Sequence, residues 1–233
     1  MGSTRLPGKV LKDLVGETVL ARVVNRTRRA KLLSEVVVAT SVLSADDVIV
    51  QECERLRVPC FRGDEADVLD RYYRAAQHFA ADVVVRITSD CPLVDPELID
   101  SVICAFQEQR ADYATNALVV TYPRGLDVEV FKFEALVRAA KCASHVYERT
   151  HVTPYIYENP ALFNIVSLSA EEDYSGYRWT IDTTEDLEMI RTVYSHFGNR
   201  DDIGWRDVLR LMEEAPELAK INSMVRQKML HEG

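Results

Sequence analysis

Short runs of apolar, mostly β-branched residues alternate along this chain with longer stretches in which apolar positions recur every three or four residues. The first pattern is typical of strands and the second of amphipathic helices. The apolar runs predict strands at Glu35–Thr40, Asp82–Thr88, Asp127–Phe131, Phe163–Leu168 and Arg178–Ile181. The helical period predicts helices at Glu17–Lys31, Ala45–Arg57, Ala66–Phe79, Pro96–Arg110, Phe133–Ala143, Thr184–His196 and Trp205–Glu214.

Several of these helices carry start signals. A capping-box interval, with Asp in place of Glu, spans Ser44–Asp47 and again Thr183–Asp186. Asp95 precedes Pro96, which puts a capping residue before a proline at the first helical position. We expect helices to begin at these three points.

The order of the elements predicts the fold class. EVVVAT and DVVVRIT are nearly continuous apolar runs, as in strands buried on both faces of a parallel sheet. Alternating strands and helices then predict a doubly wound, mostly parallel α/β sheet with its ligand at the carboxyl ends of the strands. The segment from Asp112 to Ser169 mixes strand signals and predicts a small antiparallel extension or an arm of a homodimer. No linker or repeat divides residues 1–233, which we interpret as a single domain.

Composition and charge exclude several classes of protein. Of the 233 residues 47% are hydrophobic and 28% charged, which is typical of a globular protein. The net charge of −9 disfavours nucleic acid as a partner. No apolar run approaches the ~20 residues of a membrane span. The five cysteines show no CxxC spacing, which indicates reduced thiols in a cytoplasmic protein.

Two groups of charged residues have simple structural interpretations. The basic run Arg22–Lys31 is interpreted as the exposed polar face of a helix. Asp67 and Arg71 lie four residues apart in a predicted helix, which favours a surface ion pair.

The first candidate for chemistry is the loop GSTRLPGK, which spans Gly2–Lys9. Its glycines allow close approach of the backbone to an anion, and its hydroxyl and cationic side chains can donate to phosphate oxygens. The residues concerned are Gly2, Ser3, Thr4, Arg5, Gly8 and Lys9. It is not a Walker loop, because Val10 stands where Ser or Thr is required. The alternative is a solvated, turn-rich N-terminus.

Two aspartates follow apolar strands directly. Asp90 comes after DVVVRI and Asp182 after a short apolar run. Carboxylates at strand ends suit Mg²⁺, which binds oxygen ligands and phosphates. Spacing alone favours a turn or capping role for Asp90, and the alternative for Asp182 is a helix-start residue that interacts with the positive end of the helix.

Eight ordered segments carry a resemblance to a known family. They are GSTRLPGKVL, VVVATS, FRGDEADVLDRY, RITSDCPLVDP, DYATN, YPRGLDVEVF, HVTPYI and RWTIDTTEDL. Together they span nearly the whole chain, and the sequence resembles the acylneuraminate cytidylyltransferase family, in particular its spore-coat polysaccharide branch.

This resemblance implies an activity and its cofactor. The expected fold is that of the nucleotide-diphospho-sugar transferases, and the expected reaction joins CTP and a small sugar to give CMP-sugar and pyrophosphate. Mg²⁺ would be held by Asp90 and Asp182, while Arg5 and Lys9 would stabilise the phosphates.

The resemblance also implies substrate contacts. Expected nucleotide contacts, besides the loop, are Arg62, Gly63, Arg71 and Thr88. Expected sugar contacts are Asn116, Arg124, Asp127, Glu129 and His151. On a strand, Asp127 and Glu129 face the same side. Thr183 and Asp186 keep their capping role, and Glu185 is expected to be solvated.

The family pattern places a strand and an arginine upstream of the loop. We therefore expect the natural protein to begin roughly a strand's length before Met1, about 10–14 residues. Two alternatives to the expected activity stay open. One is a nucleotidyltransferase with another base or acceptor, and the other is a non-catalytic sugar-nucleotide binder.

Overall fold

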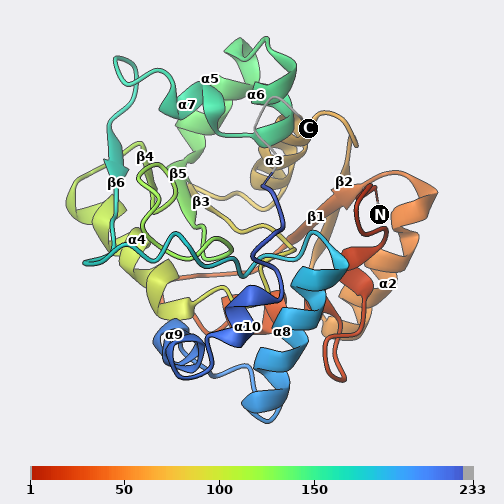
Figure 1. The fold of residues 1–233 in the computed structure, drawn as a ribbon. Coiled ribbons are helices and arrows are strands. Elements are labelled where there is room, and N and C mark those ends of the chain that lie inside the picture. The colour runs from red at the N-terminus through yellow and green to blue at the C-terminus, as the bar shows by residue number, and fades with distance from the viewer. Residues whose placement is uncertain (1, 228–233) are drawn as a thin grey trace.

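The computed structural model describes residues 2–227, which form two sheets surrounded by helices (Figure 1). The strands are β1 (Val38–Ser41), β2 (Cys60–Gly63), β3 (Val83–Arg86), β4 (Tyr113–Thr115), β5 (Glu129–Lys132) and β6 (Ile165–Ser167). β1 and β2 pair in parallel. The other four form a sheet in the order β3-β5-β4-β6, in which β5 is antiparallel to both neighbours and β4 is parallel to β6. β3, β4 and β6 therefore run in one direction and β5 alone is reversed.

Helices cover both faces of the four-stranded sheet, which in Figure 1 lies between α5–α7 at the top and α8–α10 at the bottom. The α-helices are α1 (Val19–Thr27), α2 (Asp47–Leu56), α3 (Val68–His78), α4 (Pro96–Glu108), α5 (Phe133–Cys142), α6 (Val146–His151), α7 (Pro154–Tyr157), α8 (Thr184–His196), α9 (Trp205–Glu214) and α10 (Glu217–Lys220). Short 3-10 helices are η1 (Lys9–Leu11) and η2 (Ser44–Asp46). Successive residues of β5 enter different cores, since Val130 packs with α4, α8 and α9 while Phe131 packs with α3 and α5.

This architecture confirms the predicted α/β class with its antiparallel extension. Four of the five predicted strands are present, with shifted ends. The predicted strand Arg178–Ile181 is wrong, because among residues 2–227 its one ladder contact is an isolated bridge between Arg124 and Arg178. Sequence patterns missed β2 and β4, which are short and carry polar residues. Val83 was expected in a strand buried on both faces, but its side chain is 44% exposed at the edge of the sheet.

All seven predicted helices form, but their start signals were only partly correct. Asp95 caps α4 ahead of Pro96, and Thr183 caps α8 in a complete box with Asp186. The Ser44–Asp47 box is wrong, because Ser44 opens η2 and α2 begins without a side-chain cap. The carboxylate of Asp46 instead accepts hydrogen bonds from the end of β1.

The basic run Arg22–Lys31 is exposed as predicted at Arg28, Arg29 and Lys31, but the prediction is wrong for the two arginines within α1. Arg22 and Arg26 are 3% and 0% exposed, so this face of the helix is interior rather than solvated. The Arg26 guanidinium donates to four backbone carbonyls, those of Leu93, Val94, Asp201 and Ile203. Arginine is suited to such a position because its planar fork offers five donors.

The predicted ion pair between Asp67 and Arg71 does not form. Asp67 caps α3 and pairs with Arg149 at 2.6 Å, while Arg71 donates to the carbonyl of Asp64. All five cysteines are free thiols. Within residues 2–227, no helix is long and apolar enough to cross a membrane. The strand expected before Met1 lies outside the described residues and stays a prediction.

Candidate active site

The amine of Lys9 joins the two aspartates predicted to bind the metal, Asp90 and Asp182. Its Nζ lies 2.5 Å from Asp90 Oδ2 and 2.8 Å from Asp182 Oδ1. The backbone brings the two segments together, because Ile181 N donates to the carbonyl of Asp90 at 2.8 Å. The predicted convergence of these carboxylates, which lie 92 positions apart in the printed sequence, is therefore seen in the structure.

Opposite charges in this cluster stabilise the charged forms of Lys9 and Asp182. Burial alone would lower the pKa of Lys9, but the adjacent Asp90 and Asp182 raise it above its ordinary value. Burial alone would raise the pKa of Asp182, but Lys9, Arg178 and Arg5 lower it. Lys9 and Asp182 are thus both favoured in their charged forms.

Two further cations surround Asp182. Arg5 and Arg178 approach its Oδ2 at 2.9 and 2.6 Å. Arg178 also binds Asp186, with Nε 2.9 Å from Oδ1. Asp186 is fully buried and accepts the backbone N–H of Asp182 and Thr183. Its capping role is confirmed, and it additionally fixes the arginine that contacts Asp182.

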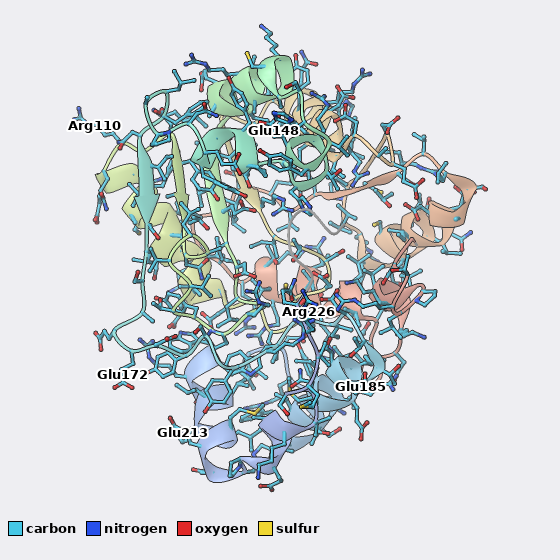
Figure 2. The ribbon with its side chains drawn as sticks, turned by 45° about the horizontal axis from the view of Figure 1, so that its top comes forward. Arg110, Glu148, Glu172, Glu185, Glu213 and Arg226 are labelled. Atoms are coloured by element: carbon cyan, nitrogen blue, oxygen red, sulfur yellow. The ribbon has the colours of Figure 1, made fainter. Side chains whose placement is uncertain are left out.

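The segment after α10 lies over this cluster. Asn222 donates to Asp186 Oδ1 and to the carbonyl of Arg178, both at 2.9 Å. The carbonyl of Arg226 accepts from Arg5 at 3.2 Å, and Gln227 Oε1 accepts from Arg178 at 2.5 Å. Figure 2 shows Arg226 near the middle of the view, and Glu185 on α8 is exposed as expected.

The conformation of the N-terminal loop positions Lys9 beside the two aspartates. Ser3 Oγ accepts from Leu6 N at 3.3 Å, and the Leu6 side chain is buried in the main core. Gly8 has a φ of 66°, a left-handed conformation that glycine adopts without strain, and η1 begins at the next residue. The loop is therefore anchored to the protein at Leu6, whereas Gly2 and Thr4 are exposed.

The donor set at this cluster suits magnesium. Among residues 2–227 no group of three or more His, Cys, Asp or Glu side chains is placed to hold a metal. Mg²⁺ typically takes one or two protein carboxylates and completes its shell with water and substrate phosphates. Asp90 and Asp182 fit this requirement, and the amine that bridges them shows that their oxygens already share one cation.

Two predicted residues lie beside the cluster. Thr88 Oγ1 is 3.0 Å from the thiol of the buried Cys91, whose Sγ is 3.6 Å from Asp90 Oδ1. Burial raises the pKa of Asp127; Arg124 opposes this rise, whereas Glu129 and Asp90 add to it. Asp127 is thus an acid close enough to Asp90 for their charges to interact.

Two predicted sugar contacts are tied into the protein interior. Glu129 binds Arg86 and accepts from Tyr113 at 2.8 Å and Thr153 at 2.5 Å. The buried Asn116 uses its side chain to join the carbonyl of Leu126 and the N–H of Val128. In this structure both side chains bind neighbouring protein groups.

The remaining predicted contacts lie on other elements. Arg62 joins the carbonyls of Ser41 and Leu43 to the carboxylate of Asp47. A Cβ on Gly63 would lie 2.8 Å from the Arg71 side chain, so these two residues pack tightly. His151 is the last residue of α6.

Sequence reasoning missed Arg178 and Asn222 as members of the site. Arg178, Asp182 and Asp186 are spaced four residues apart, and this spacing could have indicated that their side chains interact. The sequence pattern assigned Arg178 to a strand instead. Asn222 has no such pattern, because it arrives from the far end of the chain. The fold and this cluster of paired carboxylates with loop cations define a nucleotidyltransferase-like α/β protein.

Comparison with known proteins gives the family. Residues 1–220 match the family model described as Cytidylyltransferase, and the chain belongs to this family. The spore coat polysaccharide biosynthesis protein SpsF of Bacillus subtilis is 36% identical over 94% of this chain and 93% of its own length.

Solved structures agree with this assignment. A cytidylyltransferase from Leptospira borgpetersenii superposes with a TM-score of 0.90 at 32% identity, over 98% of this chain and 94% of its own. A CMP:2-keto-3-deoxy-manno-octonic acid synthetase complexed with CTP has a TM-score of 0.64 at 17% identity. It covers 84% of this chain and 95% of its own, and it shows the shared fold.

Proposed function

We propose that this protein is a magnesium-dependent cytidylyltransferase that transfers CMP from CTP to a sugar and releases pyrophosphate. The observation that carries the proposal is the Lys9 amine shared by Asp90 and Asp182 at the end of the GSTRLPGK loop. Such a cluster combines acidic oxygens for a divalent cation with basic groups for a polyphosphate.

The chemistry of nucleotidyl transfer suits this arrangement. A sugar hydroxyl attacks the α-phosphorus in line, and pyrophosphate leaves on the opposite side. Such reactions depend on positioning and on charge stabilisation rather than on a covalent intermediate. When bound at Asp90 and Asp182, Mg²⁺ would offset the negative charge of the phosphates.

The protein's own cations would act on the leaving group. Lys9 and Arg5 lie on the loop, and both contact carboxylates that a metal could take over. Their positive charges would then be directed at the β- and γ-phosphates and at the departing pyrophosphate. A preorganised charge of this kind needs little rearrangement as negative charge develops.

The choice of base and acceptor rests on the relatives. The CTP complex of the structural neighbour supports CTP as the triphosphate. The spore-coat polysaccharide name of the relative supports a sugar destined for a surface polysaccharide, and the 3-deoxy-manno-octulosonate cytidylyltransferases among the other relatives support an acidic one. We propose that Asp127, whose charge interacts with that of Asp90, contacts an acceptor hydroxyl.

The test is a panel of the four nucleoside triphosphates crossed with candidate sugars, with pyrophosphate release as the measurement. We expect release with CTP and one class of sugar only, and its loss when the divalent cation is chelated. Equal release with another triphosphate would indicate a different base specificity. Binding of CTP without release in the presence of any sugar would indicate a non-catalytic nucleotide binder.

A further inference from the structure

Two arginines from distant parts of the chain meet at one oxygen of Asp182. Arg5 Nη2 lies 2.9 Å from Asp182 Oδ2, and Arg178 Nη2 lies 2.6 Å from the same atom. Asp186 also accepts from Nε and Nη2 of Arg178, which fixes the orientation of this guanidinium. Because both arginines contact a single oxygen atom, their guanidinium groups are neighbours in the site.

The Nη1 atom of each arginine donates to the segment after α10. Arg5 Nη1 donates to the carbonyl of Arg226 at 3.2 Å, and Arg178 Nη1 donates to Gln227 Oε1 at 2.5 Å. Both acceptors are uncharged oxygens of successive residues. They belong to residues 223–227, which we call the strap. Each arginine thus places one nitrogen on Asp182 and another on the strap.

The strap is firmly attached at one end and has few buried contacts beyond it. Asn222, which precedes the strap, is 3% exposed and donates to Asp186 and to the carbonyl of Arg178. Within the strap Arg226 is exposed, and Met224 is 94% exposed. Because little apolar surface is buried there, polar contacts such as those with the two arginines hold the strap in place.

The strap also borders an internal cavity. This cavity of about 180 Å³ is lined by Val225 and Gln227 from the strap and by residues 175–179, among others. The strap is therefore not closely packed against the segment that contains Arg178. A segment with few packing contacts can leave its position at a low cost in free energy, because little dispersion attraction is lost.

An anion can replace the strap at these donors. The strap offers uncharged oxygens, whereas a phosphate group carries negative charge, which adds Coulomb attraction to each hydrogen bond. A phosphate group can also accept from two guanidinium groups at once, because its oxygens suit their planar forks. The chemistry of the donors therefore favours a phosphate group as the competitor of the strap.

We propose that Arg178 is a phosphate-binding residue alongside Arg5, and that the strap competes with a polyphosphate for the Nη1 atoms of both arginines. Binding of pyrophosphate or of a nucleoside triphosphate then releases the strap. Conversely, any change that loosens the strap raises the affinity for the anion, because the two equilibria are linked. The inference deepens the proposed function and rests on it for the choice of a polyphosphate as the ligand.

The first test measures the affinity for inorganic pyrophosphate by calorimetry, on the full chain in the presence of Mg²⁺. Gln227→Ala removes the acceptor on Arg178 and should raise the affinity about threefold to tenfold, as expected when a competing hydrogen bond is lost. Gln227→Glu places a negative charge on the same donor and should lower the affinity at least tenfold. Gln107→Ala, at an exposed position of α4, is the matched control and should bind as the unaltered protein does.

Variants of Arg178 test its assignment in the same titration. Arg178→Gln should weaken pyrophosphate binding tenfold or more, as expected when a hydrogen bond to a charged group is lost. Arg178→Lys keeps the charge but not the fork, so it should retain part of the binding. This partial rescue separates a loss of phosphate contact from a folding defect.

The second test follows the strap itself. The carbonyl that Arg5 binds belongs to the peptide bond between Arg226 and Gln227, which trypsin can hydrolyse. Pyrophosphate should therefore accelerate cleavage after Arg226, detected by mass spectrometry. Cleavage after Arg200, an exposed residue beyond the far end of α8, is the internal control and should not change.

The inference is overturned if pyrophosphate does not bind at millimolar concentration, or if Gln227→Ala binds it no more tightly than the unaltered protein. It is also overturned if both Arg178 variants bind normally, or if pyrophosphate fails to accelerate cleavage after Arg226. Each of these results leaves the proposed transfer reaction standing where CTP and a sugar still release pyrophosphate. Absence of turnover together with the expected responses would contradict the proposed function and not the role of the strap.

Discussion

The basic residues of α1 and those around Asp182 differ in burial and in the groups that they contact. Arg26 is fully buried, and its hydrogen-bond acceptors are backbone carbonyls. Lys9 and Arg5 are partly accessible, and they contact carboxylates. The first arrangement commits four of the five guanidinium N–H groups to the protein's own carbonyls, whereas the second leaves cations whose partners a metal ion or a phosphate can replace.

The difference shows that the partner of a charge, more than its sign, indicates its role. A buried arginine that satisfies carbonyls joins segments of the chain, because those carbonyls would otherwise be buried without a donor. A lysine between two aspartates can be displaced without leaving a buried polar group unsatisfied. We therefore expect Arg26 to determine stability and Lys9 to determine activity.

The largest effect should come from Arg26→Met, which keeps an apolar stem but removes the donors. Four buried carbonyls lose a partner, so we expect the free energy of unfolding to fall by about 3–4 kcal/mol, measured by urea denaturation. Arg29 lies just beyond the C-terminal end of α1 and is exposed, so Arg29→Met should change it by less than about 0.5 kcal/mol. Equal effects of the two substitutions would contradict the structural role of Arg26.

Lys9→Ala should lower the turnover with CTP on the order of 10²-fold, as expected when one preorganised charge on a developing anion is lost. Lys12→Ala is the control, because this neighbouring lysine makes no ion pair with residues 2–227. It should turn over almost normally. Near-normal turnover of Lys9→Ala at saturating CTP would show that the loop does not act on the transferring phosphates.

Asp186→Asn tests whether Arg178 must be held in place. The change removes the charge that orients Arg178 but keeps a side chain able to cap α8. By analogy with residues that orient metal ligands, turnover should fall about tenfold. Asp207→Asn, which changes the capping acid of α9, should have little effect on turnover. If both variants retain full activity, the placement of Arg178 is not limiting.

The smallest effect should be the pH dependence of the pairing of Lys9. The lowered pKa of Asp182 contributes stability that is present above its unfolded pKa and is lost as pH falls through the folded value. The raised pKa of Lys9 contributes stability that is lost as pH rises through its folded value.

The expected stability difference between the unaltered protein and Lys9→Ala is therefore constant between about pH 4 and pH 10 and shrinks on either side. Denaturation at acid, neutral and alkaline pH measures this difference in the free energy of unfolding. It should vary with pH by about 1 kcal/mol. Lys12→Ala should show no such profile. A difference that grows in acid would mean that Asp182 is not held as an ion by Lys9.

Local patterns predicted much of this fold. Apolar period and capping residues placed seven helices and four strands, because these features depend on neighbours within a few residues. They missed β2 and β4, which are short strands that contain polar residues. These strands are defined by their pairing partners. They also wrongly predicted a strand at Arg178–Ile181. The apolar pattern is present there, but among the described residues the backbone forms a single isolated bridge.

The sequence predicted those site residues whose role follows from their position next to a recognisable pattern. Asp90 and Asp182 were found because each follows an apolar run, and the contacts of Lys9 with both agree with that prediction. Arg178 and Asn222 were missed because their roles arise from contacts between distant segments. The metal, the nucleotide contacts and the sugar contacts stay predictions.

The sequence by itself determined the α/β class, the positions of most elements, and the loop and aspartates that carry the proposed chemistry. Those features follow from residue type and local spacing. Only the tertiary structure decided which charges are buried, which carboxylate binds which cation, and that Arg178 and Asn222 join the cluster around Asp182. Such contacts join residues that are far apart in the chain, and burial depends on everything packed around a side chain rather than on its neighbours in sequence.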